Sequence, residues 1–178
     1  ICDVTAFHAE GGGQLGDIGT ITAPTGVIEV TVTKKLPDGA TIMVGNVIEG
    51  TVAVGEEVTF AVQSNRKNDS ARNHTATHLL HAALKQVLGS HVNQAGSYVG
   101  PDRLRFDFSH FSQVTEAELK EVEAIVNEEI LAGKDVDIEE LPIEEAKKRG
   151  ATALFGEKYG DVVRVVTVPE FSMEFCGG

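Results

Sequence analysis

The hydrophobic pattern changes character once along the chain, at the polar stretch QSNRKNDSARN of residues 63–73. Before it, three runs rich in β-branched residues (27–33, 41–48 and 57–62) are separated by turn-forming residues, which is typical of short antiparallel strands. Several strands at this spacing predict a small antiparallel β-barrel over residues 1–63. The chain is therefore expected to contain two parts of different secondary structure.

The second part, residues 64–178, begins with a helical pattern. Apolar side chains recur at helical spacing up to Leu88, so we predict a helix over 70–88 that Asp69 or Ser70 caps and Gly89 ends. Further expected elements are strands at 91–99, 103–110, 135–141 and 161–168, a capping-box helix at 115–133 and a short helix at 142–150. The expected fold class is α+β, with helices packed on one face of an antiparallel sheet.

Charge and the chain ends limit the possible partners. The 178 residues hold 15 Lys and Arg against 27 Asp and Glu, a formal net charge of −12, which repels a polyanion unless the contact is local. No run approaches the roughly 18 apolar residues of a membrane span, and the first ten residues have neither the basic start nor the apolar core of a signal peptide. We expect a soluble, cytoplasmic protein with no membrane partner. Because Ile1 replaces an initiator Met, we also expect an excised fragment.

Three histidines occur in the octapeptide HTATHLLH. His74 and His78 are four residues apart, so on a helix they point to one side and can bind one metal ion, although the same spacing also fits a structural role. Thr75 stands where an HExxH metalloprotease carries its catalytic glutamate, which argues against that class. His81 is expected to be satisfied by a carbonyl or to support a ligand. Cys176, before two glycines, is either a third ligand or a buried small residue.

Four stretches together resemble the editing domain of alanyl-tRNA synthetases, over nearly the whole chain. They are TAFHAEGGGQLGDIG (5–19), RNHTATHLLHAALKQVLGSHVNQAGSYVGPDRLRFDFSH (72–110), GATALFGEKYGDVVRVV (150–166) and SMEFCGG (172–178). The resemblance implies hydrolysis of the ester that joins wrongly attached serine or glycine to the 3′-terminal adenosine of alanine tRNA, while the alanyl ester is spared. In that family a Thr-His pair follows the last motif and supplies a fourth zinc ligand, so an incomplete zinc site is expected before Gly178.

Site residues follow from the same motifs. The resemblance implies His74, His78 and Cys176 as zinc ligands, with Thr77 and Gln94 as polar residues of the catalytic pocket. The expected contacts to the tRNA acceptor end come from the glycine-rich loop and from basic side chains. These are Gly12, Gly13, Gln14, Arg66 and Arg72, with Lys67, Lys147, Lys148 and Arg149 as further candidates that are otherwise ordinary solvated charges.

Three hypotheses stay open at this point. No Ser–His–Asp or Cys–His nucleophile is evident, so the leading hypothesis is an aminoacyl-tRNA deacylase in which water near the zinc attacks the ester. A second is a free-standing editing protein, against which the absent initiator Met argues. A third is a zinc-stabilised module that positions the tRNA acceptor end without cutting it. The expected partners are alanine tRNA bearing serine or glycine and the aminoacylation and C-terminal domains of the synthetase.

Overall fold

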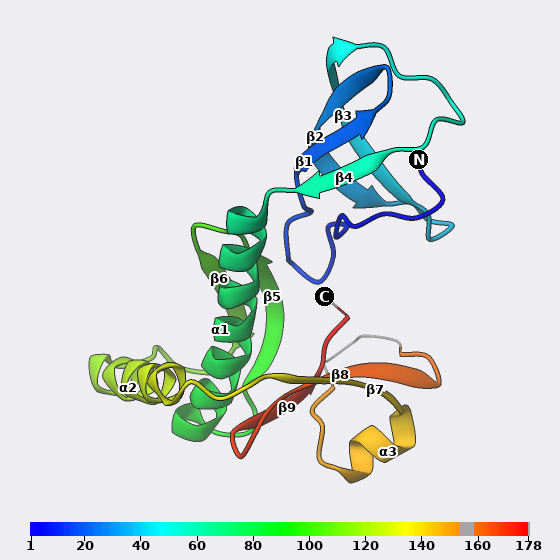
Figure 1. Cartoon of the computed structure of the whole chain (residues 1–178). Helices are drawn as coiled ribbons and strands as arrows, with labels where there is room; N and C mark the ends of the chain where they lie inside the picture. The colour runs from blue at the N-terminus through cyan, green and yellow to red at the C-terminus, as the bar shows by residue number, and fades with distance from the viewer. Residues whose placement is uncertain (154–158, 178) are drawn as a thin grey trace.

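Three antiparallel sheets and three helices make up the described part of the chain, residues 1–153 and 159–177 of a computed structural model (Figure 1). The strands are β1 (Gly19–Ala23), β2 (Gly26–Lys35), β3 (Thr41–Gly50), β4 (Thr59–Val62), β5 (Asn93–Val99), β6 (Leu104–Ser109), β7 (Asp137–Pro142), β8 (Val162–Val168) and β9 (Ser172–Phe175). The helices are α1 (Ser64–Leu88), α2 (Glu116–Ala132) and α3 (Ile143–Lys148). The expected α+β composition is confirmed. None of these helices is long and apolar enough to cross a membrane.

The N-terminal sheet is open, so the prediction of a closed barrel is not confirmed. Its four strands lie in the order β3-β2-β1-β4, and β3 and β4 form its two edges. Phe7 packs edge-to-face on Phe60, with 5.9 Å between the ring centroids, and helps to cover the apolar face. The glycine-rich segment does not add a strand to either edge, because its backbone bonds to β5: Val99 N–H donates to Gly13 O at 2.8 Å, and Leu15 N–H donates to Val99 O at 3.0 Å.

Helix α1 starts six residues earlier than the sequence pattern predicts. Gln63 alone separates it from β4, and the Gln63 N–H donates to the carbonyl of Ile18, which fixes the junction. Asp69 and Ser70 therefore lie inside the helix and do not cap it. Asp69 instead accepts a hydrogen bond from Arg72 one turn on. The helix ends at Gly89, as predicted, where a φ of 112° suits glycine.

The β5–β6 hairpin and α2 pack on α1 around a common apolar core. Its buried members are Ala83, Leu84, Val92 and Val122, and Phe106 and Phe108 of β6 pack against them. The predicted capping box of α2 is present: Thr115 accepts from Glu118 N–H, and Glu118 accepts from Thr115 N–H. Gly133 ends this helix in the left-handed conformation, with a φ of 61°.

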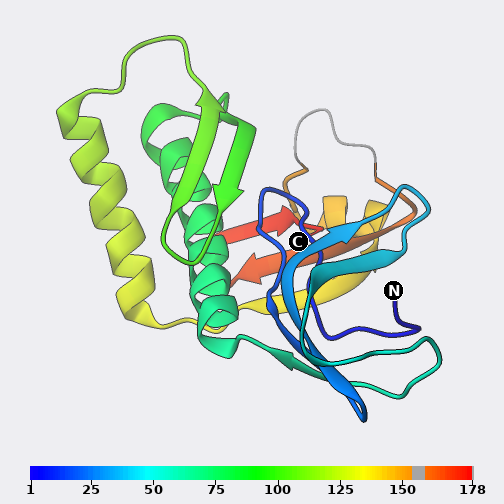
Figure 2. The same cartoon turned by 90° about the horizontal axis from the view of Figure 1, so that it is seen from above.

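A third sheet, in the order β7-β8-β9, carries α3 and brings the C-terminal segment beside α1. The second part of the chain thus holds two small sheets, β5–β6 and β7–β9, where the sequence analysis expected helices on one sheet. Strands β1 and β9 were not predicted. Both views place the segment that follows β9 between α1 and the N-terminal sheet (Figures 1 and 2). Part of the stretch 150–166 used for the resemblance, residues 154–158, lies outside the described residues.

Candidate metal centre

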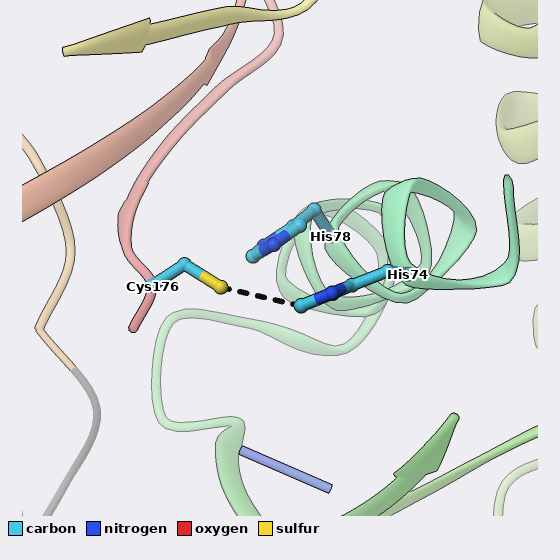
Figure 3. Close-up of side chains that lie close together, drawn as sticks. All are labelled: His74, His78 and Cys176. Atoms are coloured by element: carbon cyan, nitrogen blue, oxygen red, sulfur yellow. Dashed lines mark hydrogen bonds between the residues drawn. The ribbon is translucent and has the colours of Figure 1, made fainter. Parts of the chain in front are cut away.

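His74, His78 and Cys176 meet at one point although Cys176 lies about a hundred residues further along the chain. Their ligand atoms all lie within 4.8 Å of one another, and Cys176 Sγ is 3.2 Å from His74 Nε2. Both imidazoles extend from α1 toward the thiol that follows β9 (Figure 3). The two rings are stacked, with 5.2 Å between centroids and 13° between planes, as the four-residue helical spacing requires. This donor set can hold a metal ion.

Each of these histidines is held on its other ring nitrogen by a different acceptor. His74 Nδ1 lies 2.6 Å from Gln14 Oε1, and His78 Nδ1 lies 2.6 Å from Glu174 Oε2. A donor at Nδ1 leaves the Nε2 lone pair free to bind a metal, and such outer partners fix both the tautomer and the ring orientation. The arrangement is therefore that of two imidazole ligands with their supports in place.

Glu174 is a buried carboxylate, 5% exposed, that lies between two histidines. Its second oxygen is 2.7 Å from His81 Nδ1, so His81 contacts the carboxylate that holds His78. Burial opposes the charged form of Glu174, but the hydrogen bond from His78 and the nearby imidazole of His81 outweigh it and lower the pKa of the carboxyl to about 2. Glu174 thus supplies a fixed negative charge behind the candidate ligands.

The protonation of His78 and Cys176 is coupled to the negative charge of Glu174. Burial lowers the pKa of His78, but its hydrogen bonds to Cys176 and Glu174 outweigh burial and raise that pKa to about 9. Burial likewise raises the pKa of the Cys176 thiol, and hydrogen bonds from His74 and His78 outweigh it and lower that pKa to about 5. The lowered pKa favours the thiolate form of Cys176 at neutral pH, and a thiolate is the form that binds metals.

The same geometry also forms a Cys–His pair, which the sequence analysis did not find. A thiolate 3.2 Å from an imidazole whose second nitrogen is oriented by Gln14 has the layout of an activated nucleophile, its base and an orienting amide. A second imidazole, His78, also converges on the sulfur, and a nucleophile needs only one base. The pair of histidines favours the metal centre over the covalent alternative.

A cavity of about 380 Å³ opens beside the three candidate ligands. Its lining includes both expected pocket residues, Thr77 of α1 and Gln94 of β5, together with Gly12 of the glycine-rich loop. Thr77 is buried, and its hydroxyl donates to Asn73 O at 2.9 Å, so its oxygen is left as an acceptor. The cavity therefore combines a possible metal, a hydroxyl acceptor and a side-chain amide.

The loop at Gly12 and Gly13 is a tight turn. Gly11 N–H donates to Gln14 O, Gln14 N–H donates to Gly11 O, and both central residues have positive φ values of 58° and 85°. A Cβ at Gly13 would lie 2.2 Å from Ser97 Oγ and 2.7 Å from Ser97 O, so only glycine fits. The turn is anchored in the fold, and it directs Gln14 to His74.

The basic side chains expected to contact phosphate lie outside this cavity. Lys67 is bound to the buried carboxylate of Asp17 at 2.7 Å, and Arg72 is exposed and paired with Asp69. Arg66 is half-buried and does not line the cavity. On α3 and beyond it, Lys147 and Arg149 pair with glutamates of their own region, and Lys148 is exposed. The charge of Lys67 in particular is already compensated within the fold.

Two residues at the centre were not singled out from the sequence. Glu174 is two residues before Cys176, so the alternation of an extended backbone puts both side chains on one face. A single charged residue beside the apolar residues of this strand was the sequence feature that could have identified Glu174. Arg164 of β8 gave no such signal. Its guanidinium donates to Cys176 O at 2.8 Å and its carbonyl accepts from Cys176 N–H at 3.0 Å, which fixes the backbone that carries the thiol.

Comparisons with known proteins point to one group. Residues 1–66 match the family described as tRNA synthetases class II (A). The chain is 57% identical over 178 residues to the alanine–tRNA ligase of Acetivibrio thermocellus and 55% identical to that of Bacillus pumilus, covering 100% of the chain and 20% of each relative. It is 56% identical over 174 residues to the alanine–tRNA ligase of Listeria welshimeri. The chain spans about 20% of the length of these relatives.

Proposed function

This chain corresponds over its whole length to a segment of the alanine–tRNA ligase family, and from that premise we propose that it is an editing deacylase. Its substrates are alanine tRNAs that carry serine or glycine on the 3′-terminal adenosine. Water adds to the ester carbonyl carbon, the bond from that carbon to the ribose oxygen breaks, and the free amino acid and the adenosine hydroxyl are released. The reaction takes place in the cytoplasm, where the remainder of the ligase charges the same tRNA.

The observation that carries this proposal is the convergence of two residue sets in one cavity. The candidate ligands His74, His78 and Cys176 come from α1 and the C-terminal segment, and the pocket residues Thr77 and Gln94 come from α1 and β5. A cavity of about 380 Å³ falls within the size range of small-ligand sites and suits an aminoacyl-adenosine end. A purely structural metal site would not require an open cavity that contains a buried hydroxyl and a side-chain amide.

We propose zinc as the ion, because two imidazoles and one thiolate form a donor set that zinc takes. Tetrahedral zinc with bonds of roughly 2.0–2.3 Å holds its donor atoms roughly 3.3–3.8 Å apart. The donor atoms here lie within 4.8 Å of one another, so small side-chain shifts suffice. His74, His78 and Cys176 would hold the ion, and a bound zinc would supply a Lewis acid beside the ester.

Thr77 is the proposed reader of serine. Its hydroxyl hydrogen is committed to Asn73 O, so its oxygen accepts a hydrogen bond from the serine hydroxyl, which alanine cannot donate. A buried acceptor left without a donor costs about 1–3 kcal/mol, which penalises the alanyl ester. This contact distinguishes serine only, because glycine has no side-chain hydroxyl to donate to Thr77. Gln94 is proposed to orient the amino acid by its side-chain amide.

The contact between Cys176 and His74 supports a second, covalent mechanism as an alternative. The Cys176–His74 pair could attack the ester carbonyl itself, forming a thioester and releasing the tRNA hydroxyl, after which water would hydrolyse the thioester. The two mechanisms differ in their sensitivity to reagents. A chelator abolishes the zinc-dependent reaction and leaves the covalent one intact, whereas a thioester trapped by acid quenching occurs only in the covalent one.

The proposal is tested by incubating the zinc-supplemented chain with alanine tRNA charged with radiolabelled serine. Release of serine faster than in a no-protein control is the expected result. A module that merely positions the acceptor end predicts binding of this tRNA with no release above the control, and that outcome would overturn the deacylase. Because the net charge is −12, tRNA binding by the chain alone is expected to be weak and salt-sensitive.

A further inference from the structure

We propose that Gln14 is a positioning residue for the metal ligand His74, so that the glycine turn acts on the metal centre itself. The sequence predicts that this loop contacts tRNA. The structure places the Gln14 side chain away from solvent, at 8% exposure, with its amide oxygen 2.6 Å from His74 Nδ1. The inference rests on the proposed metal site and is independent of whether the site hydrolyses an ester.

The contact defines which nitrogen of His74 is available. An amide oxygen only accepts, so His74 Nδ1 carries a hydrogen, and Nε2 is the nitrogen that faces Cys176 and is available to a metal. Loss of the acceptor would let the imidazole change tautomer or rotate about its side-chain bonds. Outer partners of this kind typically change metal affinity by about 10–100-fold. Gln14 has the same relation to His74 that Glu174 has to His78.

The backbone around Gln14 is fixed tightly enough to act as a support. The turn between Gly11 and Gln14 closes on itself by two hydrogen bonds, and the segment is tied to Val99 on both sides of Gln14. The fit of Gly13 against Ser97 leaves no room for a side chain, which fixes the height of the turn over β5. A small displacement of the turn would therefore move the Gln14 amide relative to His74.

The consequence is a physical link between the N-terminal segment and the metal. Gln14 precedes the first sheet, while the three candidate ligands lie on α1 and after β9. If docking of the turn strengthens metal binding, metal binding must strengthen docking of the turn by the same factor. Gly12 of this turn lines the cavity, so a substrate that displaces the turn would also move the Gln14 amide relative to His74.

The test compares zinc affinities, measured by competition with a chromophoric chelator, among the full chain and three variants. Gln14→Ala is expected to weaken zinc binding by about 10–100-fold. Gln14→Glu keeps an acceptor oxygen and is expected to bind zinc at least as tightly as the unmodified chain. Gln113→Ala, a change of the same residue type at an exposed position in the β6–α2 connection, is expected to have no effect.

A spectroscopic readout separates positioning from general damage. With Co²⁺ in place of zinc, the thiolate and d–d absorption bands are expected to shift in Gln14→Ala and to match the unmodified chain in Gln14→Glu. Equal zinc affinity in Gln14→Ala and the unmodified chain would overturn the inference, as would equal losses in Gln14→Ala and Gln14→Glu. Failure of the unmodified chain to bind zinc would instead overturn the proposed metal site, so the two failures are distinguishable.

Discussion

Cys176 Sγ lies 3.2 Å from His74 Nε2, although 102 residues separate the two in the sequence. The contact forms because β9 packs against α1 and Cys176 follows β9 directly. Helical spacing thus positions His74 and His78 of the candidate centre, and the packing of the C-terminal sheet on α1 positions Cys176. Substitutions that alter this docking should act on the metal as strongly as substitutions of the ligands.

The two cysteines provide a matched pair for testing the donor set. Cys176→Ala removes one of three candidate ligands and should lower zinc affinity by at least about 100-fold, because it also leaves two imidazoles without the thiolate. Cys2→Ala should leave zinc affinity unchanged, since Cys2 lies near the N-terminus and outside the cluster. Zinc content per chain after gel filtration gives the result, and equal zinc in both variants would refute the ligand assignment.

The buried pair of His78 and Glu174 predicts how the metal-free chain responds to pH. The pKa of His78 is raised from 6.5 to about 9, so its stabilisation is complete below pH 6.5 and is lost as the pH rises toward 9. The pKa of Glu174 is lowered from 4.5 to about 2, so its stabilisation is complete above pH 4.5 and is lost as the pH falls toward 2. The pair should stabilise the fold most between about pH 4.5 and 6.5.

Urea unfolding in the presence of a chelator measures this effect when the unmodified chain is compared with Glu174→Gln. The difference in free energy of unfolding between the two should be largest within that window and should shrink by pH 9, because His78 is then losing its proton. A difference that stays constant from pH 5 to pH 9 would show that the carboxylate contributes by packing or shape rather than by its charge on His78.

Lys67 and Arg66 are neighbours in sequence but should behave differently. Lys67 compensates Asp17, whose side chain is 5% exposed, whereas Arg66 has no such buried partner among the ion pairs of the described residues. Lys67→Met should therefore destabilise the fold by about 1–3 kcal/mol, discounted because Lys67 is itself 43% exposed. Arg66→Met should change stability by less than about 0.5 kcal/mol. Thermal unfolding distinguishes the two, and equal shifts would contradict a structural role for Lys67.

Thr77→Val tests the proposed reader of serine while nearly preserving side-chain volume. Removing the acceptor oxygen should reduce the ratio of seryl-ester to alanyl-ester hydrolysis by about tenfold, the effect of one hydrogen bond of about 1.4 kcal/mol. Thr75→Val, two residues earlier, should leave the ratio unchanged, because Thr75 does not line the cavity that Thr77 lines. The measurement is the pair of kcat/KM values for the two esters, and an unchanged ratio in Thr77→Val would remove Thr77 from discrimination.

Local patterns predicted much of the secondary structure because the relevant signals are short in range. The capping box at Thr115 and Glu118 and the glycine that ends α1 act through neighbours within one turn. The start of α1 was misplaced because two residues typical of a cap, Asp69 and the buried Ser70, lie inside the helix, while Gln63 is fixed by a distant carbonyl. The closed barrel was expected from strand spacing, which carries no information on whether the edge strands meet.

For the candidate centre, sequence reasoning named the donors and missed their supports. His74 and His78 share a helix, so their spacing alone brings them together. Glu174 and the role of Gln14 depend on contacts across 96 and 60 residues, which no spacing rule supplies. The nearness of Cys176 to His74 was expected only from a family resemblance. Tertiary docking decides all three contacts, and it also produced the Cys–His pair that the sequence did not suggest.

The most direct test of the account is the rate of amino-acid release from alanine tRNA carrying serine and from the same tRNA carrying alanine, before and after removal of metal. The account predicts that the zinc-loaded chain releases serine much faster than alanine, that a chelator reduces serine release to the no-protein rate, and that added zinc restores it. Equal release of serine and alanine, or serine release that persists at full rate in the chelator, would contradict a zinc-dependent editing site at His74, His78 and Cys176.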